Sequence, residues 1–258
     1  MFEYTKMTIS GIDVYHYPVC DSTNKRIKEM AHDAKNGTVC IADQQTEGRG
    51  RKDRKWLSRS GAGAWFSCLI KPDKDIPAMA GAGLVFVSAI STASVLREMT
   101  GADIRIKWPN DLVLNGKKIC GIMCEMRLRD MFLDYAVAGI GVNLIGHDFP
   151  EDLPYASSIE HETGIRITPI EFLGKFIETN NKYLKIWEES GVGEILRRIE
   201  PISATIGKTV KAISDSGTIV GKAIGFTEDG SLRIMTDTGE RTFIAGDVSV
   251  RGIMGYSD

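Results

Sequence analysis

The chain has 258 residues, of which 43% are hydrophobic and 26% are charged, and its formal net charge at pH 7 is −2. These values are ordinary for a globular protein, and the length allows one large domain and a small one. The slightly negative charge excludes an overall positive field for holding nucleic acid, so any anion-binding patch must be local.

The first residues favour strands over a leader or a DNA-reading helix. Residues 1–4 lack the basic and apolar segments of a signal peptide. Residues 7–10 and 14–17 are predicted as short strands, and Ser22 lies too near the start to leave room for a helix-turn-helix. Asp21-Ser22-Thr23 then supplies N-cap candidates for a helix that ends at Asn36-Gly37.

A short buried strand at residues 39–42 leads into a loop, residues 45–56, that combines glycines with five cations and ends in Trp56. Glycine lets the backbone approach a ligand closely, and guanidinium groups suit carboxylate and phosphate oxygens. The loop is therefore a candidate anion clamp, although the same pattern also fits a nucleic-acid tether or a solvated turn. Glu47 stands just before the clamp, where an uncharged small residue would disturb anion binding less, and Lys52-Asp53 follows Arg51 where a glycine would be natural.

Residues 64–70 form the next expected strand, and a helix is predicted over residues 78–99. The run 78–96 carries no charge and is long enough to cross a membrane. It is diluted by glycine, serine and threonine and stands alone in the chain. A buried helix of small residues that ends near Gly101 is therefore the favoured interpretation.

Asn115-Gly116 between two apolar runs is a strong signal for a two-residue hairpin. It predicts paired strands at residues 111–114 and 119–125, with Lys118 directly after the turn. A lone lysine there would be a solvated turn residue. Here Lys107, Asn110 and Asp111 lie close by, together with a Trp-Pro pair, and this density of polar groups favours a site.

A further strand is expected at residues 133–141. Thr168-Pro169-Ile170-Glu171 matches a capping box with proline at the first helical position. The apolar side of that helix is expected to carry Ile170, Leu173, Ile177, Leu184 and Trp187. Hairpins mixed with separate helices predict an α+β fold, in which a mixed, largely antiparallel sheet packs against helices.

The composition changes near Pro201. From Gly207 onward, turns at residues 215–217, 228–230 and 237–239 separate four or five short strands. About fifty residues of this kind describe a small closed β-barrel. We therefore expect two domains, residues 1–204 and residues 205–258.

The five cysteines are scattered, and none of the four histidines lies near them at metal-ligand spacing. Free thiols in a reducing cytoplasm are the simplest interpretation. No signal for a structural metal site is present in this pattern.

Several short motifs recur in the order and near-spacing of one known family. They are Asp21-Ser22-Thr23-Asn24, Gln45, Gly48-Arg49-Gly50-Arg51, Lys55-Trp56, Lys107-Trp108-Pro109-Asn110-Asp111, Lys118, Gly121-Ile122 and Gly139-Ile140-Gly141-Val142-Asn143. Together they resemble the biotin protein ligases, which attach biotin to acetyl-CoA carboxylase and related carboxylases. The resemblance covers almost the whole chain, and it implies that the C-terminal barrel is SH3-like. In some relatives a DNA-binding helix-turn-helix precedes the catalytic domain; because Ser22 lies near the start, we expect the form without it.

The resemblance also implies a role for each matching residue. Biotin would be bound by Ser22, Thr23, Asn24, Gln45, Arg49, Gly50, Arg51, Lys118 and Gly121. The nucleotide would be bound by Trp56, Lys107, Asn110, Asp111 and Asn143, with Asp111 as a Mg²⁺ ligand. Lys118, Arg49 and Arg51 would carry the catalysis. Purely structural roles are the alternatives for several of these residues: a loop anchor for Trp56, an acceptor for backbone donors at the hairpin edge for Asp111, and helix caps for Ser22 and Thr23. Gly141 and Asn143 are expected in a strand-end turn that lines the pocket.

The chemistry of such a reaction needs cations and no general base. A carboxylic acid of the biotin type is ionised at neutral pH, so its attack on the α-phosphate of ATP brings two anions together. At an effective dielectric of about 20, like charges about 4 Å apart repel by roughly 4 kcal/mol. Fixed cations aimed at that charge, with Mg²⁺ on the leaving pyrophosphate, offset the repulsion.

The expected partners are biotin, ATP and the biotin carboxyl carrier protein domain of a carboxylase, with no specific DNA and no membrane. A homodimer is compatible with the chain. Two other functions stay open from the sequence. A lipoate or octanoate ligase or transferase would share the fold, and a nucleic-acid-binding protein could use the basic loop and the barrel.

Overall fold

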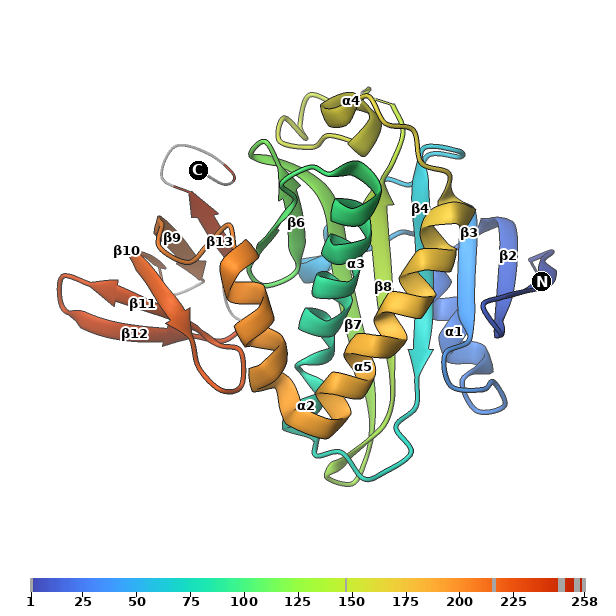
Figure 1. Cartoon of the computed structure of the whole chain (residues 1–258), viewed down its shortest axis with the longest axis horizontal. Helices are drawn as coiled ribbons and strands as arrows, with labels where there is room; N and C mark the ends of the chain where they lie inside the picture. Colours follow the sequence, from blue (N-terminus) through green and yellow to red (C-terminus); the bar gives the residue numbers. More distant parts are fainter. Residues whose placement is uncertain (1, 147, 215–216, 246–248, 253–255, 257–258) are drawn as a thin grey trace.

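The structure is a computed structural model that describes residues 2–146, 148–214, 217–245, 249–252 and 256. Its main element is an eight-stranded sheet (Figure 1). The strands lie in the order β1 (Thr5–Ile9), β2 (Ile12–Cys20), β3 (Val39–Gln45), β4 (Gly63–Ile70), β8 (Phe132–Asn143), β7 (Lys117–Arg129), β6 (Asp111–Leu114) and β5 (Arg105–Lys107). Neighbours are antiparallel except β2 and β3, which are parallel. The predicted mixed, largely antiparallel sheet is confirmed, as are the strands that precede Ser22.

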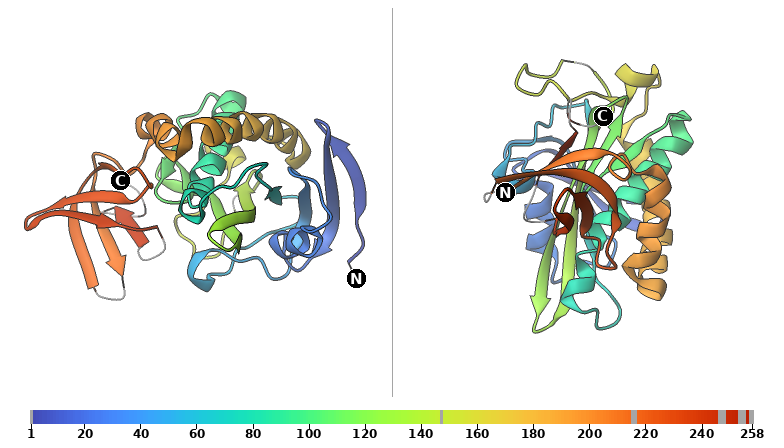
Figure 2. Two further views of the ribbon diagram at one scale, coloured as in Figure 1. Left: turned by 90° about the horizontal axis from the view of Figure 1, so that it is seen from below. Right: turned by 90° about the vertical axis from the view of Figure 1, so that its left-hand side faces the viewer.

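Helices cover both faces of this sheet, and the alternation of side chains along each strand divides the core accordingly. Helices α3 (Leu84–Thr100) and α5 (Pro169–Ile199) cover one face (Figures 1 and 2). On that side the ring of Phe66 packs against Phe172 and Phe176 of α5. Helix α1 (Thr23–Met30) covers the other face, where Ile27 packs with residues such as Leu69.

The predicted helix over residues 78–99 is divided into α2 (Ala78–Gly81) and α3. The two glycines near the break bring neighbouring elements close, because a Cβ on Gly81 or Gly83 would lie 2.7 Å from Met126 or Val192. Glycine is also a weak helix former. The span Ala78–Thr100 is long and apolar enough to cross a membrane, but 72% of an apolar 18-residue stretch within it is buried inside the protein. The expected core helix is confirmed, and it ends at Gly101 in a left-handed conformation.

The predicted hairpin joins β6 to β7. Asn115 and Gly116 both have positive φ, 51° and 74°, as the favoured two-residue turn requires. The pairing register shifts between Leu112 and Val113, so that Val113 pairs with Lys118 and Ile119 is the extra residue of a β-bulge.

Helix α5 begins with the predicted capping box at Thr168 and Glu171. The assignment of Ile170 to its apolar side is wrong, because that side chain is 43% exposed. Phe172 and Phe176 fill the core over the first turns instead. The helix changes direction at Gly191, where φ is 75°. The short helix α4 (Ile159–Thr163) and two 3₁₀ turns, η1 (Arg51–Asp53) and η2 (Glu200–Ile202), complete the helical elements of the described residues.

The C-terminal part is a five-stranded, SH3-like antiparallel sheet. Its order is β12 (Gly239–Phe243), β11 (Leu232–Thr236), β10 (Gly217–Phe226), β9 (Thr209–Ser214) and β13 (Ser249–Gly252). The turns expected at residues 228–230 and 237–239 are present, whereas residues 215 and 216 lie outside the described residues. The sheet packs against the larger one (Figure 2): Trp108 donates its indole N–H to the Gly230 carbonyl at 2.9 Å.

Candidate active site

A cavity of about 830 Å³ is lined by residues from the start of α1, the loop 47–57, strands β7 and β8, residues 107–111 and residues 149–156, together with Ser249, Val250, Arg251 and Tyr256. It collects every residue that the sequence marks for a site: Ser22, Thr23, Asn24, Gln45, Arg49, Gly50, Arg51, Trp56, Lys107, Asn110, Asp111, Lys118, Gly121 and Asn143. Residues far apart in the chain thus face one another across one space.

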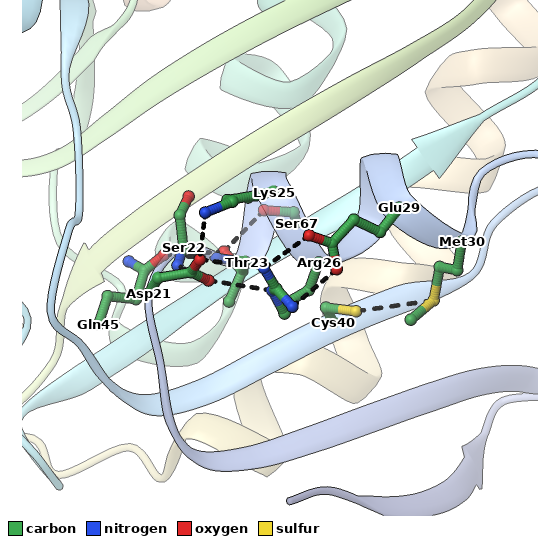
Figure 3. A network of polar contacts seen from close by, with 10 residues as sticks. All are labelled: Asp21, Ser22, Thr23, Lys25, Arg26, Glu29, Met30, Cys40, Gln45 and Ser67. Atoms are coloured by element: carbon green, nitrogen blue, oxygen red, sulfur yellow. Dashed lines mark hydrogen bonds and ion pairs between the residues drawn. The ribbon is translucent and has the colours of Figure 1, made fainter. Parts of the chain in front are cut away.

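The start of α1 lines one end of the cavity and carries a polar network in which side-chain hydrogen bonds lie beside the ion pairs of Asp21, Lys25, Arg26 and Glu29 (Figure 3). Gln45 Oε1 accepts from the Thr23 backbone N–H at 2.8 Å and from the Thr23 hydroxyl at 3.1 Å. Ser67 in turn donates to the Thr23 hydroxyl at 2.7 Å. Ser22 occupies the N-cap position, but its side chain makes no capping bond. The expectation that Ser22 or Thr23 caps the helix through its side chain is therefore wrong, because Thr23 is bonded to Gln45.

Asn24 extends this network toward β7. Its Oδ1 lies 2.6 Å from Ser67 Oγ, and its Nδ2 donates to Glu125 Oε2 at 2.6 Å. Glu125 also forms an ion pair with Lys28, with 2.8 Å between Nζ and Oε1. A Cβ on Gly139 would lie 2.2 Å from Asn24 Oδ1, so only glycine leaves room for this amide. Ser67 and Glu125 were not predicted, and both lie far from Asn24 in sequence.

The loop that carries the cations is a compact hairpin. The N–H of Gly50 donates to the Arg54 carbonyl at 2.7 Å, and the N–H of Trp56 donates to the Gly48 carbonyl at 2.9 Å. A Cβ on Gly48 would lie 2.7 Å from the Trp56 carbonyl oxygen, which accounts for glycine there. Lys52 has a φ of 55°, a left-handed conformation that glycine adopts more easily. This is the position at which the sequence indicated that glycine would be natural.

The two arginines of the loop differ in their surroundings. Arg49 is exposed, whereas Arg51 is half-buried. Arg51 donates from Nη1 to Asn110 Oδ1 at 3.1 Å and from Nη2 to the Ala245 carbonyl of the C-terminal sheet. Burial lowers the pKa of Arg51, although a guanidinium stays charged at neutral pH. Arg51 thus links the loop to the floor of the cavity and to the C-terminal sheet.

Trp56 lies over the sheet at the paired residues Gly121 and Gly141. A Cβ on these glycines would lie 2.8 Å and 2.5 Å from the indole, so both must be glycine for the ring to lie there. Trp56 therefore anchors the loop and lines the cavity at once. Gly141 and Asn143 belong to strand β8, so their assignment to a strand-end turn is wrong, and Asn143 donates to the Ser157 carbonyl at 2.9 Å.

A cluster of charges occupies the cavity wall at the β6–β7 hairpin. Nζ of Lys118 lies 2.7 Å from Oδ1 of Asp111, and Oδ2 of the same carboxylate accepts from the Tyr256 hydroxyl. Burial alone would raise the pKa of Asp111, but the Lys118 and Lys107 ammonium groups hold it below its ordinary value. Burial lowers the pKa of Lys107 to about 8. Asp111 is therefore ionised at neutral pH, beside the ammonium groups of Lys118 and Lys107.

The C-terminal part supplies groups that hold this cluster. Lys107 donates to the Val250 carbonyl at 2.7 Å. The ring of Tyr256 lies 4.1 Å from the Lys107 ammonium and 4.5 Å from the Arg251 guanidinium, and it stacks on Tyr155 with 5.8 Å between centroids. Tyr256 was not predicted, because nothing in the surrounding sequence marks it.

Asp111, the predicted Mg²⁺ ligand, is engaged at both of its carboxylate oxygens. They already face a cation or a hydroxyl donor, so a metal contact would require Lys118 or Tyr256 to move away. Nowhere in the described ranges do three histidine, cysteine, aspartate or glutamate side chains gather at metal-binding distances.

Comparison with known families gives matches to both parts of the chain. Residues 17–143 match the Biotin/lipoate A/B protein ligase family, and residues 205–251 match the Biotin protein ligase C terminal domain. The Bifunctional ligase/repressor BirA of Bacillus subtilis is 31% identical over 249 residues, which cover 95% of this chain and 76% of that protein. The chain belongs to the biotin protein ligase family.

Two further relatives extend the comparison of this ligase. The Biotin--[acetyl-CoA-carboxylase] ligase of Paracoccus denitrificans is 29% identical over 90% of this chain and 98% of its own length. The structure of the biotin protein ligase of Aquifex aeolicus in complex with biotin and ATP superimposes with a TM-score of 0.81 at 32% identity, covering 93% of this chain and 98% of that one. The first family model alone includes lipoate enzymes, whereas the C-terminal match and these relatives are biotin ligases.

Proposed function

We propose that the protein activates biotin with ATP to form biotinyl-5'-AMP and then transfers biotin to a lysine of a biotin carboxyl carrier protein domain, in acetyl-CoA carboxylase or a related carboxylase. The observation that carries this proposal is the course of strand β7 through the cavity. Lys118 stands at one end of the strand, Gly121 lies in the middle, and Glu125 lies at the other end beside the Asn24 amide. A ligand with a polar ring at one end and a carboxylate at the other fits this arrangement.

In the first step, a carboxylate oxygen of biotin forms a bond to the α-phosphorus of ATP, and the bond from that phosphorus to the bridging oxygen of pyrophosphate breaks. The carboxylate is already ionised, so no group of the protein needs to remove a proton. Lys118, Arg49 and Arg51 would offset the repulsion between the two anions and the charge that develops on the α-phosphate. Mg²⁺ would enter with ATP and neutralise the leaving pyrophosphate.

Biotin would place its ureido ring among Ser22, Thr23, Asn24 and Gln45, while Gly50 and Gly121 would let the backbone approach the ligand. Oxygen acceptors and hydroxyl donors at this end suit a ring that has one carbonyl and two N–H groups. The nucleotide would lie toward Trp56, Lys107, Asn110, Asp111 and Asn143. Asn110 and Asp111 are engaged by Arg51, Lys118 and Tyr256 in the structure, so ATP would exchange some of these partners.

In the second step, the amine of the acceptor lysine attacks the biotinyl carbonyl, an amide bond forms and AMP leaves with the bonding electrons. A mixed anhydride hydrolyses in water, so the loop 45–56 would cover it until the acceptor arrives. We assign residues 1–204 to catalysis and residues 205–258 to a second domain that braces the nucleotide end. Five free thiols in the described structure suit a reducing cytoplasm.

The activation step can be tested by ATP–pyrophosphate exchange with each of three acids: biotin, lipoate and octanoate. We expect label to exchange with biotin and to stay near background with the other two. Exchange that depends on lipoate or octanoate would favour the lipoyl-type alternative, and exchange with none of the acids would contradict the proposed activation.

A further inference from the structure

The side-chain amide of Asn24 is bonded at both of its ends. Its Oδ1 receives the Ser67 hydroxyl at 2.6 Å and lies over Gly139, and its Nδ2 donates to Glu125 at 2.6 Å. Glu125 is only partly exposed, with 32% of its side chain accessible, and Lys28 holds its other oxygen at 2.8 Å. The proposed chemistry uses Asn24 at the biotin ring and gives Glu125 and Lys28 no role.

Only one of the two partners of this amide can decide which way it points. A serine hydroxyl can donate or accept, and Ser67 also lies within bonding distance of Thr23, so Ser67 would tolerate either orientation of Asn24. An ionised carboxylate can only accept. Burial raises the pKa of Glu125, but the hydrogen bonds from Lys28 and Asn24 bring it below its ordinary value, so the group is a carboxylate at neutral pH. The NH₂ of Asn24 must therefore face Glu125.

We propose that Glu125 is a positioning residue that fixes the Asn24 amide with its oxygen toward the ligand, so that the site selects a ring N–H of biotin. This inference rests on the proposed function. The oxygen of Asn24 has a second lone pair available beside Ser67, and a cyclic urea offers an N–H to it. A flipped amide would set its NH₂ against that N–H, and two donors would meet with no acceptor between them.

Lys28 of helix α1 holds the Glu125 carboxylate in place. Lys28 lies on α1, the same helix that carries Asn24. Its ion pair with Glu125 therefore joins β7 to this helix beside the Asn24 amide. Gly139 on β8 supplies the floor, since any Cβ there would displace the Asn24 oxygen. Three elements of the fold thus converge on one amide.

Two variants separate the acceptor role from the mere presence of a side chain. Glu125→Ala removes the acceptor, whereas Glu125→Gln can still turn its carbonyl oxygen toward Asn24. Biotin binding measured by calorimetry should weaken by about 10- to 100-fold in E125A, the range expected when a buried polar pairing is lost. It should stay within about threefold of the wild type in E125Q. KM for ATP and kcat for pyrophosphate exchange at saturating biotin should change by less than about threefold in both.

A charge swap gives the sharpest comparison. The double variant Lys28→Glu with Glu125→Lys keeps an ion pair between α1 and β7 but places a group that can only donate beside Asn24. We expect biotin binding to fall at least about tenfold while thermal unfolding stays close to the wild type. Glu98→Ala, which removes an exposed carboxylate from its pair with Lys175 on the far helices, serves as the control for loss of a surface ion pair.

A biotin analogue in which one ring N–H is replaced by oxygen reports on selectivity itself. Biotin has two ring N–H groups, so there are two such analogues. The wild type should bind biotin at least about tenfold more tightly than it binds the better analogue, and E125A should lose most of this difference in affinity. Wild-type affinity in E125A, wild-type affinity in the charge swap, or an unchanged preference in E125A would overturn the positioning role. Failure of the wild-type protein to exchange pyrophosphate with biotin would instead count against the proposed function.

Discussion

The ammonium of Lys118 and the carboxylate of Asp111 face each other across the β6–β7 hairpin at 2.7 Å. The two-residue turn at Asn115-Gly116 sets this contact, because it pairs Leu114 with Lys117 and Val113 with Lys118. Lys118 therefore lies on the same face of the sheet as Val113 and as Asp111, two residues away from Val113. The β-bulge at Ile119 then shifts the register, so that Gly121 pairs with Asp111.

Lys118→Ala should reduce the rate of biotinyl-adenylate formation by more than about 100-fold, because removal of one preorganised charge donor costs a few kcal/mol at the transition state. Pyrophosphate release in a single turnover measures this step. Lys117→Ala is the matched control, since Lys117 donates to the Pro154 carbonyl outside the charge cluster. Pyrophosphate release by K118A at the wild-type rate would refute the assigned role.

The affinity for ATP should depend on pH through Lys107. Burial lowers the pKa of this lysine to about 8, so its positive charge is lost as pH rises through that value. KM for ATP should therefore increase between about pH 7 and about pH 9, a range in which an ordinary lysine stays charged. Lys107→Met should have a raised KM at every pH and no such increase. A wild-type KM that is constant over this range would show that Lys107 does not serve the nucleotide as a cation.

Arg51→Ala should weaken biotin binding and release free biotinyl-5'-AMP. Arg51 ties the loop to Asn110 and Ala245, and a reactive anhydride survives only while a closed loop excludes water. Chromatography of the reaction mixture measures the released adenylate. Arg59→Ala, a change of an exposed arginine just beyond the loop, should release none. Retention of the adenylate by R51A at wild-type levels would exclude the loop as the cover.

Residues 1–258 should form no sequence-specific complex with DNA, although the Bacillus subtilis relative carries the word repressor in its name. The segment before α1 forms strands β1 and β2, and the net charge is −2, so a groove-reading helix and a broad cationic face are not supplied. A gel-shift titration against the upstream DNA of the gene, in low salt with biotin and ATP, checks this. A specific nanomolar complex would overturn it.

Local signals in the sequence were sufficient for the elements that frame the site. The Asn115-Gly116 turn predicts the hairpin because both residues accept positive φ, and the capping box predicts the start of α5. The bulge at Ile119 could not be predicted, because the residues around it read as an uninterrupted strand. Ile170 was misplaced because periodicity describes a helix face and does not indicate where that face leaves the core.

The site residues that were missed share one property. Glu125 and Tyr256 line the cavity and the buried Ser67 contacts Asn24, in each case through contacts between distant segments. Glu125 is separated from Asn24 by 101 positions, and Tyr256 from Asp111 by 145. Each stands in a stretch with no motif of its own. Predicted residues that do line the cavity, such as Arg51 and Lys118, lie in motifs whose composition already indicates anion chemistry.

The most direct test of the central claim is mass spectrometry of a biotin carboxyl carrier protein domain after incubation with the protein, ATP, Mg²⁺ and biotin. If the protein is an ATP-dependent biotin ligase, the acceptor gains the mass of one biotinyl group on its target lysine. We expect this gain to disappear when ATP is omitted or when K118A replaces the wild type. An acceptor of unchanged mass, or one that gains a lipoyl group when lipoate is supplied instead, would contradict the account.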